Sequence, residues 1–313
     1  MYSSKIYNKT SCLLVLVGPT AVGKTELAIS LARWLDTEIV STDSRQFYQE
    51  MNIGTAKPTE NERKTVPHHL VNFLSIQTSY DVKSFEQDAL EAIQNIFNRK
   101  TFALATGGSG LYVKVLCEGI DEMPQGSEDL KKNLAKRLEQ EGLESLANEL
   151  QAKDPVYYHS ADIKNPRRVL RALEVIESSG KPYSSFRQQK KNQIRPFRTI
   201  KIGLQRERET LYKRIDQRVD QMLSAGLFEE AERLYPYRHL NALQTVGYQE
   251  IFSYLDGAYD RTEAIRLIKR NSRRFAKRQL TWFRKDEEIR WFDAGKERAQ
   301  LEDEVKHYLQ QVL

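Results

Sequence analysis

Cysteine and long apolar runs are both scarce in this sequence. Its 313 residues include two cysteines, Cys12 and Cys117, too few for a disulfide framework or a cysteine-rich zinc site. The longest apolar run, from Cys12 to Val17, spans six residues, whereas a membrane helix needs about 20. That run is also too short for a secretory signal peptide. These absences predict a cytoplasmic protein that makes no contact with a membrane.

Histidines are few and lack the spacing of metal ligands. His68 and His69 are adjacent, and the other three of the five are scattered along the chain. A structural zinc site draws its ligands from regularly spaced pairs of His or Cys. We therefore expect structural or hydrogen-bonding roles for His68 and His69.

Positive charge is concentrated in one segment. The chain has 49 Lys and Arg against 43 Asp and Glu, and ten of the cations lie between Arg261 and Lys285, with Glu263 as the one acid. Such a patch attracts nucleic acid or other polyanions. The aromatic residues within it, such as Phe275 and Phe283, fit either stacking on unpaired bases or the core face of a helix.

Strands and helices alternate in the first half of the chain. Apolar patterns predict strands at 13–17, 38–41 and 101–105, and helices at 26–35 and 84–97. This alternation is typical of an α/β fold in which helices cover both faces of a parallel sheet.

The pattern changes at the turn-rich segment 121–126. Helical periodicity then dominates, and an alternating segment at 199–204 predicts that the sheet resumes there. From Arg208 onward the pattern is helical almost throughout. We therefore predict a core made of residues 1–124 and 191–313, the latter ending in a basic helical region, with a helical insertion domain at 125–190.

A phosphate-binding loop follows the first predicted strand. Residues 18–25 fit the pattern G-x-x-x-x-G-K-[ST] between a strand and a helix, the context that supports such a loop. Its backbone N–H groups point at a bound phosphate, Lys24 adds positive charge, and the Thr25 hydroxyl can coordinate Mg²⁺. The residues predicted to bind a di- or triphosphate are Gly18, Pro19, Thr20, Ala21, Val22, Gly23, Lys24 and Thr25.

The acid that a nucleotide hydrolase places after a second apolar strand is missing here. The strand that ends at Ala105 is followed by Thr106 and glycines, and the acid in a comparable position is Asp43, after the strand at 38–41. Asp43 suits a base for an attacking nucleophile or a metal ligand through water, although an acid there can also simply cap a turn. Two classes of P-loop enzyme remain: a small-molecule kinase, and a transferase with a diphosphate leaving group.

Several segments, taken in order along the chain, resemble one enzyme family. They are the phosphate loop, Asp43–Gln46, Pro67–Leu70, Thr106–Tyr112, Asn165–Glu174, Val246–Glu250 and Ala276–Arg284. The same segments recur in this order in the tRNA dimethylallyltransferases, with small departures at Val22, Arg45 and Ser109. The sequence resembles a bacterial form, because both cysteines lie upstream of the place where eukaryotic relatives carry a zinc finger.

The resemblance implies transfer of a dimethylallyl group from dimethylallyl diphosphate to the exocyclic N6 amine of adenosine 37 of tRNA, beside the anticodon. It also implies a P-loop NTPase-like core, an insertion that clamps the anticodon stem-loop, and Mg²⁺ on the diphosphate. We expect the chain to act as a monomer.

The chemistry of prenyl transfer suggests roles for particular residues. An adenine amine is a weak nucleophile, so transfer needs a stabilised leaving group and a proton acceptor. Asp43 is the candidate base, Thr106 a hydrogen-bonding group at the neighbouring strand end, and Lys24 a cation for the leaving diphosphate. Arg214 and Arg218, four residues apart on a predicted helix, share one face. They either face solvent beside two aspartates or, as the resemblance favours, bind the diphosphate.

The acceptor base must leave the stack of the anticodon loop to react. Segment 43–46 suits the flipped base, since a glutamine such as Gln46 can form two hydrogen bonds with adenine. Two basic clusters, the segment 261–285 and the arginines at 167, 168 and 171, are suited to binding the RNA backbone. The residues predicted to contact tRNA are Asp43, Ser44, Arg45, Gln46, Thr106, Arg167, Arg168, Arg171, Val246, Gly247, Tyr248, Gln249, Lys277 and Arg278.

Two other functions fit part of the sequence. A small-molecule or nucleoside kinase would share the phosphate loop and the acid at a strand end, but it would use ATP and need no basic patch. An RNA-binding protein with a relict loop would not need Lys24 and Thr25. The basic clusters and the intact loop therefore favour the tRNA prenyltransferase.

Overall fold

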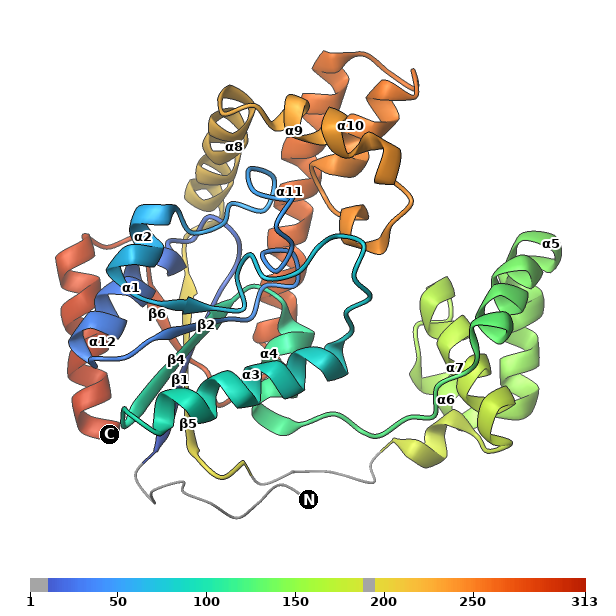
Figure 1. Ribbon diagram of the computed structural model, residues 1–313, viewed down its shortest axis with the longest axis horizontal. Coiled ribbons are helices and arrows are strands. Elements are labelled where there is room, and N and C mark those ends of the chain that lie inside the picture. The colour runs from blue at the N-terminus through green and yellow to red at the C-terminus, as the bar shows by residue number, and fades with distance from the viewer. Residues whose placement is uncertain (1–10, 188–194) are drawn as a thin grey trace. The chain divides into compact units, whose positions relative to one another are not determined.

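A parallel sheet is the centre of the larger part of the molecule. The computed structural model describes residues 11–187 and 195–313. Within these residues six strands pair in the order β3-β2-β4-β1-β5-β6, and every pairing is parallel (Figure 1). The strands are β1 (Cys12–Val17), β2 (Ile39–Ser41), β3 (His68–His69), β4 (Phe102–Gly107), β5 (Arg198–Gln205) and β6 (Arg290–Asp293). The predicted α/β class with a parallel sheet is confirmed.

The described residues also form α-helices. They are α1 (Lys24–Trp34), α2 (Glu60–Thr65), α3 (Val82–Phe97), α4 (Gly110–Glu118), α5 (Glu128–Lys153), α6 (Pro155–Ser160), α7 (Pro166–Ser179), α8 (Arg208–Ser224), α9 (Leu227–Leu234), α10 (Tyr248–Leu255), α11 (Arg261–Phe283) and α12 (Arg298–Val312). Three short 3-10 helices are η1 (Tyr183–Phe186), η2 (Tyr235–Tyr237) and η3 (Asn241–Leu243). None of the described helices is long and apolar enough to cross a membrane.

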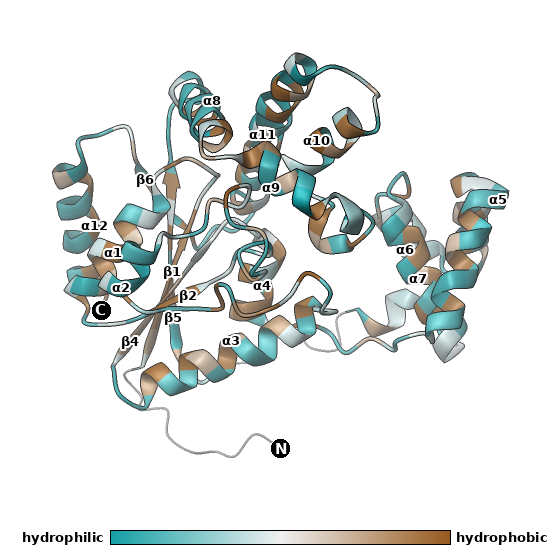
Figure 2. Cartoon of the chain, turned by 45° about the horizontal axis from the view of Figure 1, so that its top comes forward, coloured by the Kyte–Doolittle hydropathy of each residue, from teal (hydrophilic) through white to brown (hydrophobic). Residues whose placement is uncertain are grey.

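Side chains of β1 point alternately to the two faces of the sheet. Leu14 and Leu16 pack with α1 and α12 on one face, whereas Leu13 and Val15 pack with α3 and α4 on the other. A strand buried on both faces needs apolar residues at every position, which explains the unbroken apolar run of β1. Figure 2 shows apolar residues gathered on the strands and on the helices that cover them.

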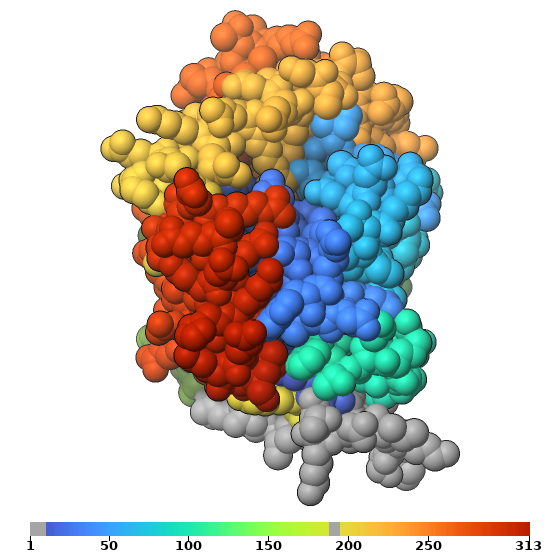
Figure 3. Space-filling model, turned by 90° about the vertical axis from the view of Figure 1, so that its left-hand side faces the viewer, coloured from blue at the N-terminus to red at the C-terminus, as the bar shows by residue number. Residues whose placement is uncertain are grey.

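The last helix of the chain packs beside the first. Ser30 of α1 donates a hydrogen bond of 2.6 Å to Glu302 of α12, and in Figure 3 the red atoms of the C-terminal helix lie against the blue atoms of the N-terminal part. Strand β6 leads into α12, and the helical pattern after Arg208 did not predict it. The four residues of β6 bury one side chain, Phe292, so the strand is too short to produce an alternating signal.

A second apolar core joins helices α9, α10 and α11 to the segment after β2. Tyr248 and Ile251 of α10 pack there with Phe228 of α9 and Ile268 of α11. Met51, from the segment between β2 and α2, is fully buried in the same core. This contact fixes the start of the loop that follows Met51.

Residues 118–194 form a separate compact unit built from α5, α6 and α7. Leu134, Leu146 and Leu173 lie in its core. Helix α5 bends at Gly142, whose φ of 79° is left-handed. The predicted insertion, 125–190, lies inside this unit, and its predicted end falls outside the described residues.

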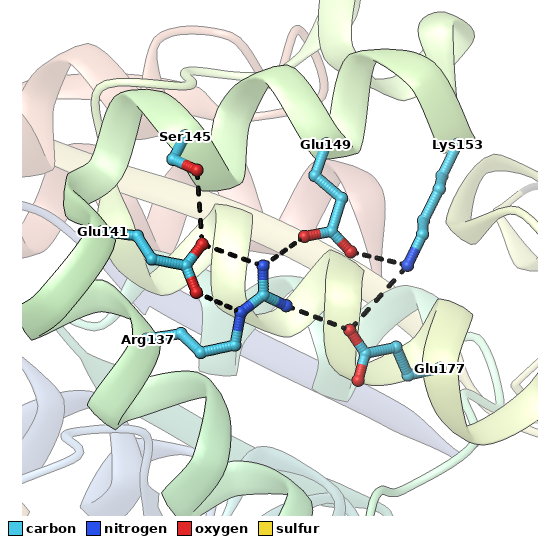
Figure 4. A network of polar contacts seen from close by, with 6 residues as sticks. All are labelled: Arg137, Glu141, Ser145, Glu149, Lys153 and Glu177. Carbon is cyan, nitrogen blue, oxygen red and sulfur yellow. Dashed lines mark hydrogen bonds and ion pairs between the residues drawn. The ribbon is translucent and has the colours of Figure 1, made fainter.

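One guanidinium group ties the two halves of α5 to α7 (Figure 4). Arg137 donates hydrogen bonds to Glu141 at 2.7 Å and to Glu149 at 2.6 Å, and it lies 3.7 Å from Glu177 of α7. Although Glu149 is partly buried, its hydrogen bonds with Arg137 and Lys153 lower the pKa of its carboxyl group. Glu149 is therefore charged at neutral pH, and the network holds the two halves of the bent helix together.

Candidate active site

A cavity of about 970 Å³ opens at the carboxyl edge of the sheet. The segments that follow β1, β2 and β4 all line it, because the carboxyl ends of parallel strands meet at one edge. Of the residues predicted from the sequence, those on its wall are Thr20, Ala21, Val22, Gly23, Lys24, Thr25, Asp43, Ser44, Arg45, Gln46, Thr106, Arg214, Arg218, Val246, Gly247, Gln249 and Arg278. Segments far apart in the chain thus share one cavity.

The phosphate loop is tightly packed against the neighbouring strand. Gly18 has a φ of 151°, and a Cβ atom there would lie 2.7 Å from the carbonyl oxygen of Leu204 in β5. A side chain at this position would therefore displace the loop. Lys24 folds back over the loop, where its Nζ atom donates hydrogen bonds to the carbonyl oxygens of Gly18 at 2.9 Å and Pro19 at 2.8 Å.

The ammonium group of Lys24 lies in an unfavourable electrostatic environment. Burial, together with the positive charge of Arg218, lowers its pKa to about 7, although the Asp43 carboxylate acts in the opposite direction. Burial also lowers the pKa of the Arg218 guanidinium, again opposed by Asp43. Two desolvated cations facing one cavity form a site that favours a multiply charged anion.

Helix α8 directs two of its three arginines at the phosphate loop. The Nε atom of Arg214 donates to the carbonyl oxygen of Ala21 at 3.0 Å, and Arg218 donates to the hydroxyl of Thr20 at 3.2 Å. The aspartates of α8 point elsewhere: Asp216 pairs with Arg273 at 2.5 Å and Asp220 with Lys269 at 2.6 Å, both on α11. The solvent-facing alternative for these arginines is therefore wrong.

Asp43 and Thr106 lie at adjacent strand ends because β2 and β4 are neighbours. Ser41 is the register partner of Thr106, and the Thr42 amide donates to the Thr106 carbonyl at 2.8 Å. One Asp43 oxygen accepts from the Arg45 amide at 3.0 Å, so this carboxylate does cap a turn while it lines the cavity. The Thr106 hydroxyl donates to the Leu16 carbonyl at 3.1 Å.

Gln46 is held by a loop that the sequence analysis did not single out. Its Nε2 atom donates to the carbonyl oxygens of Thr55 and Ala56, both at 3.3 Å, and its Oε1 atom accepts from the Ser41 hydroxyl at 3.3 Å. Both amide hydrogens are thus occupied. In this geometry Gln46 can accept a hydrogen bond from a base but cannot form the two-bond contact with adenine that we predicted.

Helix α11 contributes a buried polar residue that was also missed. Gln279 is 6% exposed, accepts a hydrogen bond from the Thr20 amide at 2.9 Å and donates one to the Gly108 carbonyl at 2.9 Å. It shares the inner face of α11 with Ala276 and Phe283, which are buried. A glutamine at an apolar position of a helix was the sequence signal for this role.

The aromatic residues of α11 divide between core and cavity. Phe283 is buried, whereas Phe275 and Trp282 are 39% and 42% exposed and line the cavity. The guanidinium of Arg278 lies 5.8 Å from the centre of the Phe275 ring. The cavity wall therefore combines exposed rings with a cation.

Several predicted site residues lie away from this wall. Gly18 and Pro19 form the base of the loop, and Lys277 faces a smaller cavity of about 520 Å³. The expectation for Tyr248 needs correction: its side chain is fully buried, and its hydroxyl donates to Glu230 at 2.6 Å. Its ring fills the core instead of facing RNA.

The arginines of the smaller unit differ in their contacts. Arg167 and Arg168 are exposed in the first turn of α7. Arg171 is bonded to Glu174 at 2.6 Å and to the Pro124 carbonyl at 3.0 Å. Arg171 therefore holds the segment before α5 against α7.

The paired histidines take part in hydrogen bonds. His69 lies 2.6 Å from a Glu38 oxygen, and Nδ1 of His68 lies 2.7 Å from the Val66 carbonyl. Burial lowers the pKa of His68, which favours its neutral form. Among residues 11–187 and 195–313, no group of three or more His, Cys, Asp and Glu residues could hold a metal ion.

The fold and the cavity define a P-loop α/β protein with a cationic site at the edge of its sheet. Comparison with known proteins narrows this class. A family model described as IPP transferase matches residues 46–286. A tRNA dimethylallyltransferase of Christiangramia forsetii is 49% identical over 294 residues, which cover 94% of this chain and 97% of the relative.

Solved structures similar to this chain belong to the same kind of enzyme. A full-length tRNA isopentenylpyrophosphate transferase from Bacillus halodurans superposes with a TM-score of 0.71 at 38% identity, covering 97% of this chain and 96% of that one. A eukaryotic dimethylallyltransferase acting on tRNA has a TM-score of 0.77 at 28% identity, covering 91% and 74%. The chain belongs to the IPP transferase family.

Proposed function

We propose that the cavity transfers a dimethylallyl group from dimethylallyl diphosphate to the exocyclic N6 amine of adenosine at position 37 of tRNA, giving N6-isopentenyladenosine. The observation that carries this proposal is that one cavity joins a cationic phosphate loop to the carboxylate of Asp43. Relatives across nearly the whole chain are named tRNA dimethylallyltransferases, which favours prenyl transfer over the kinase alternative.

The diphosphate binds at the phosphate loop. Lys24, Arg214 and Arg218 surround this end of the cavity. As the bond between the allylic carbon and the diphosphate oxygen breaks, negative charge grows on the leaving group. Preorganised cations in a desolvated site stabilise this charge more than water does.

The amine proton is taken by Asp43. While its Oδ1 atom accepts from the Arg45 amide at 3.0 Å, Oδ2 is the atom that we assign to the acceptor amine. Thr106, at the neighbouring strand end, accepts the Thr42 amide through its carbonyl and helps to hold Asp43 in place. A base in hydrogen-bond reach of the amine accelerates such a transfer by about 10²–10⁴.

Mg²⁺ fits the donor set of this site. Mg²⁺ binds proteins through one or two oxygen ligands and completes its shell with substrate phosphates and water. The Thr25 hydroxyl and the Asp43 carboxylate supply oxygen atoms on the same wall. We assign Thr25 as the direct ligand. When bound, the ion would neutralise charge on the leaving diphosphate.

The RNA enters over the exposed rings of α11. Phe275 and Trp282 offer stacking surfaces for unstacked bases, and Arg278 supplies a cation for the backbone. Val246, Gly247 and Gln249 line the same wall. For the smaller unit, residues 118–194, we propose that the exposed Arg167 and Arg168 bind the backbone of the anticodon stem.

We propose that the enzyme acts as a monomer, because one chain supplies all the residues that line the cavity. We also place its activity in the cytoplasm, a reducing compartment that suits a chain with only two cysteines.

The test uses the full chain with labelled dimethylallyl diphosphate, Mg²⁺ and an unmodified anticodon stem-loop that has adenosine at position 37. We expect label on that base and none when guanosine replaces the adenosine. Phosphate transfer from ATP to a small acceptor, without prenyl transfer, would contradict the proposal.

A further inference from the structure

A buried carboxylate organises one wall of the cavity from outside it. Glu230 of α9 is 2% exposed. Its Oε2 atom accepts hydrogen bonds from the backbone amides of Asn52 and Ile53, both at 2.9 Å, and its Oε1 atom accepts from the Gly54 amide at 3.0 Å. Three consecutive N–H groups of a loop thus depend on one side chain that lies more than 170 residues away in the sequence.

Tyr248 completes this arrangement. Its hydroxyl donates to Oε1 of Glu230 at 2.6 Å, and burial next to this carboxylate raises the pKa of the phenol. A Cβ atom on Gly54 would lie 2.6 Å from the Tyr248 ring. The loop therefore runs directly over the tyrosine, and glycine is the residue that allows this approach. We call Glu230, Tyr248 and the amides of residues 52–54 the loop clamp.

The loop held by the clamp continues along the cavity wall. Gly54, Thr55, Ala56 and Lys57 all line the cavity. The carbonyl oxygens of Thr55 and Ala56 occupy both amide hydrogens of Gln46. Glu230 thus holds the first half of a short loop, and the next two residues of the same backbone hold the side chain that faces the acceptor site.

We propose that Glu230 and Tyr248 are positioning residues for the acceptor base: the clamp fixes loop 52–57, and the loop orients the Gln46 carboxamide so that its oxygen accepts a hydrogen bond from the adenine amine. This inference rests on the proposed function. It gives Glu230 of α9 and Tyr248 of α10, both buried, a role at the site. The diphosphate end of the cavity is held by other residues and does not depend on the clamp.

The proposal predicts a selective defect in acceptor binding. In Tyr248→Phe one hydrogen bond of the clamp is lost, and in Glu230→Gln an amide NH₂ faces backbone donors. We expect KM for the anticodon stem-loop to rise about tenfold in either variant, the effect of losing one such bond. Affinity for inorganic pyrophosphate should stay within twofold of wild type. Tyr259→Phe is the matched control, because it removes a tyrosine hydroxyl bond in the same core, to the Glu250 carbonyl, that does not reach the loop.

Hydrogen exchange tests the clamp without any substrate. The amides of residues 52–54 should exchange at least tenfold faster in Glu230→Gln, while those of α10 keep wild-type rates. The positioning role is overturned if both variants keep the wild-type KM for the stem-loop. It is also overturned if the rise in KM is accompanied by a loss of pyrophosphate affinity and of thermal stability. A wild-type enzyme that fails to prenylate the stem-loop would contradict the proposed function instead, and the exchange rates would still report on the clamp.

Discussion

Gln279 and Thr20 are joined by a hydrogen bond of 2.9 Å although 259 residues separate them in the sequence. The same glutamine side chain donates to Gly108. One buried amide of α11 thus connects the phosphate loop after β1 to the glycine-rich loop after β4. These loops form adjacent parts of the cavity wall, so their spacing depends on a third segment.

Replacing Gln279 by leucine should weaken diphosphate binding. The variant leaves the Thr20 amide and the Gly108 carbonyl without their partner, and an unsatisfied buried polar group costs about 1–3 kcal/mol. We expect the affinity for inorganic pyrophosphate, measured by calorimetry, to fall at least about tenfold. Thr281→Val on the same helix, which removes a hydroxyl bond to the Lys277 carbonyl, should bind normally. Equal affinity in Gln279→Leu would show that the loops keep their spacing unaided.

Binding of a diphosphate should take up a proton at Lys24. In the free protein its pKa is lowered to about 7, and a bound anion raises that value because it favours the charged form. Affinity should therefore be highest where Lys24 is already protonated and should fall as pH rises above about 7. Calorimetry of pyrophosphate binding in buffers of different ionisation enthalpy measures the uptake.

Lys24→Arg provides the reference for that experiment. Its guanidinium stays charged across the range, so the variant retains only the protons that pyrophosphate itself gains or loses. The difference between the two proteins isolates Lys24. An identical pH dependence in both would mean that Lys24 is fully charged before the ligand binds.

Removing the Asp43 carboxylate should stop transfer while leaving RNA binding nearly intact. In Asp43→Asn the side-chain oxygen can still accept the Arg45 amide, so the turn survives and only the base is lost. We expect the single-turnover rate to fall about 10²–10⁴-fold. Asp43→Ala removes the turn bond as well and should be no faster. Near wild-type turnover in either variant would rule out Asp43 as the base.

Chelation of divalent cations should abolish transfer, and Thr25 should set the requirement for Mg²⁺. Thr25→Ala removes the hydroxyl that we assign to the ion, whereas Thr25→Ser keeps it. We expect the Mg²⁺ concentration for half-maximal rate to rise about tenfold or more in the alanine variant, because the loss of even an outer-shell partner of a metal ligand weakens metal binding about 10–100-fold. Unchanged Mg²⁺ dependence in Thr25→Ala would show that the ion has no ligand there.

Local patterns predicted much of the core, because a strand buried on two faces gives an apolar run in the sequence and a phosphate loop gives a fixed spacing of glycines. The expected strand at 13–17 became β1, from Cys12 to Val17, and the strand expected at 199–204 became β5, from Arg198 to Gln205. Strand β6 left no such mark, since one of its four side chains is buried. Its existence depends on pairing with β5.

By itself, the sequence determined that a phosphate loop follows an apolar strand and that Asp43 and Thr106 lie at strand ends of the same sheet. It could not determine which polar side chains enter the core. Glu230 and Gln279 occupy the inner faces of α9 and α11, beside Ala231 and Ala276, where helix periodicity calls for apolar residues. Only the tertiary structure brings backbone amides to them, and a buried polar group is stable once it has such partners.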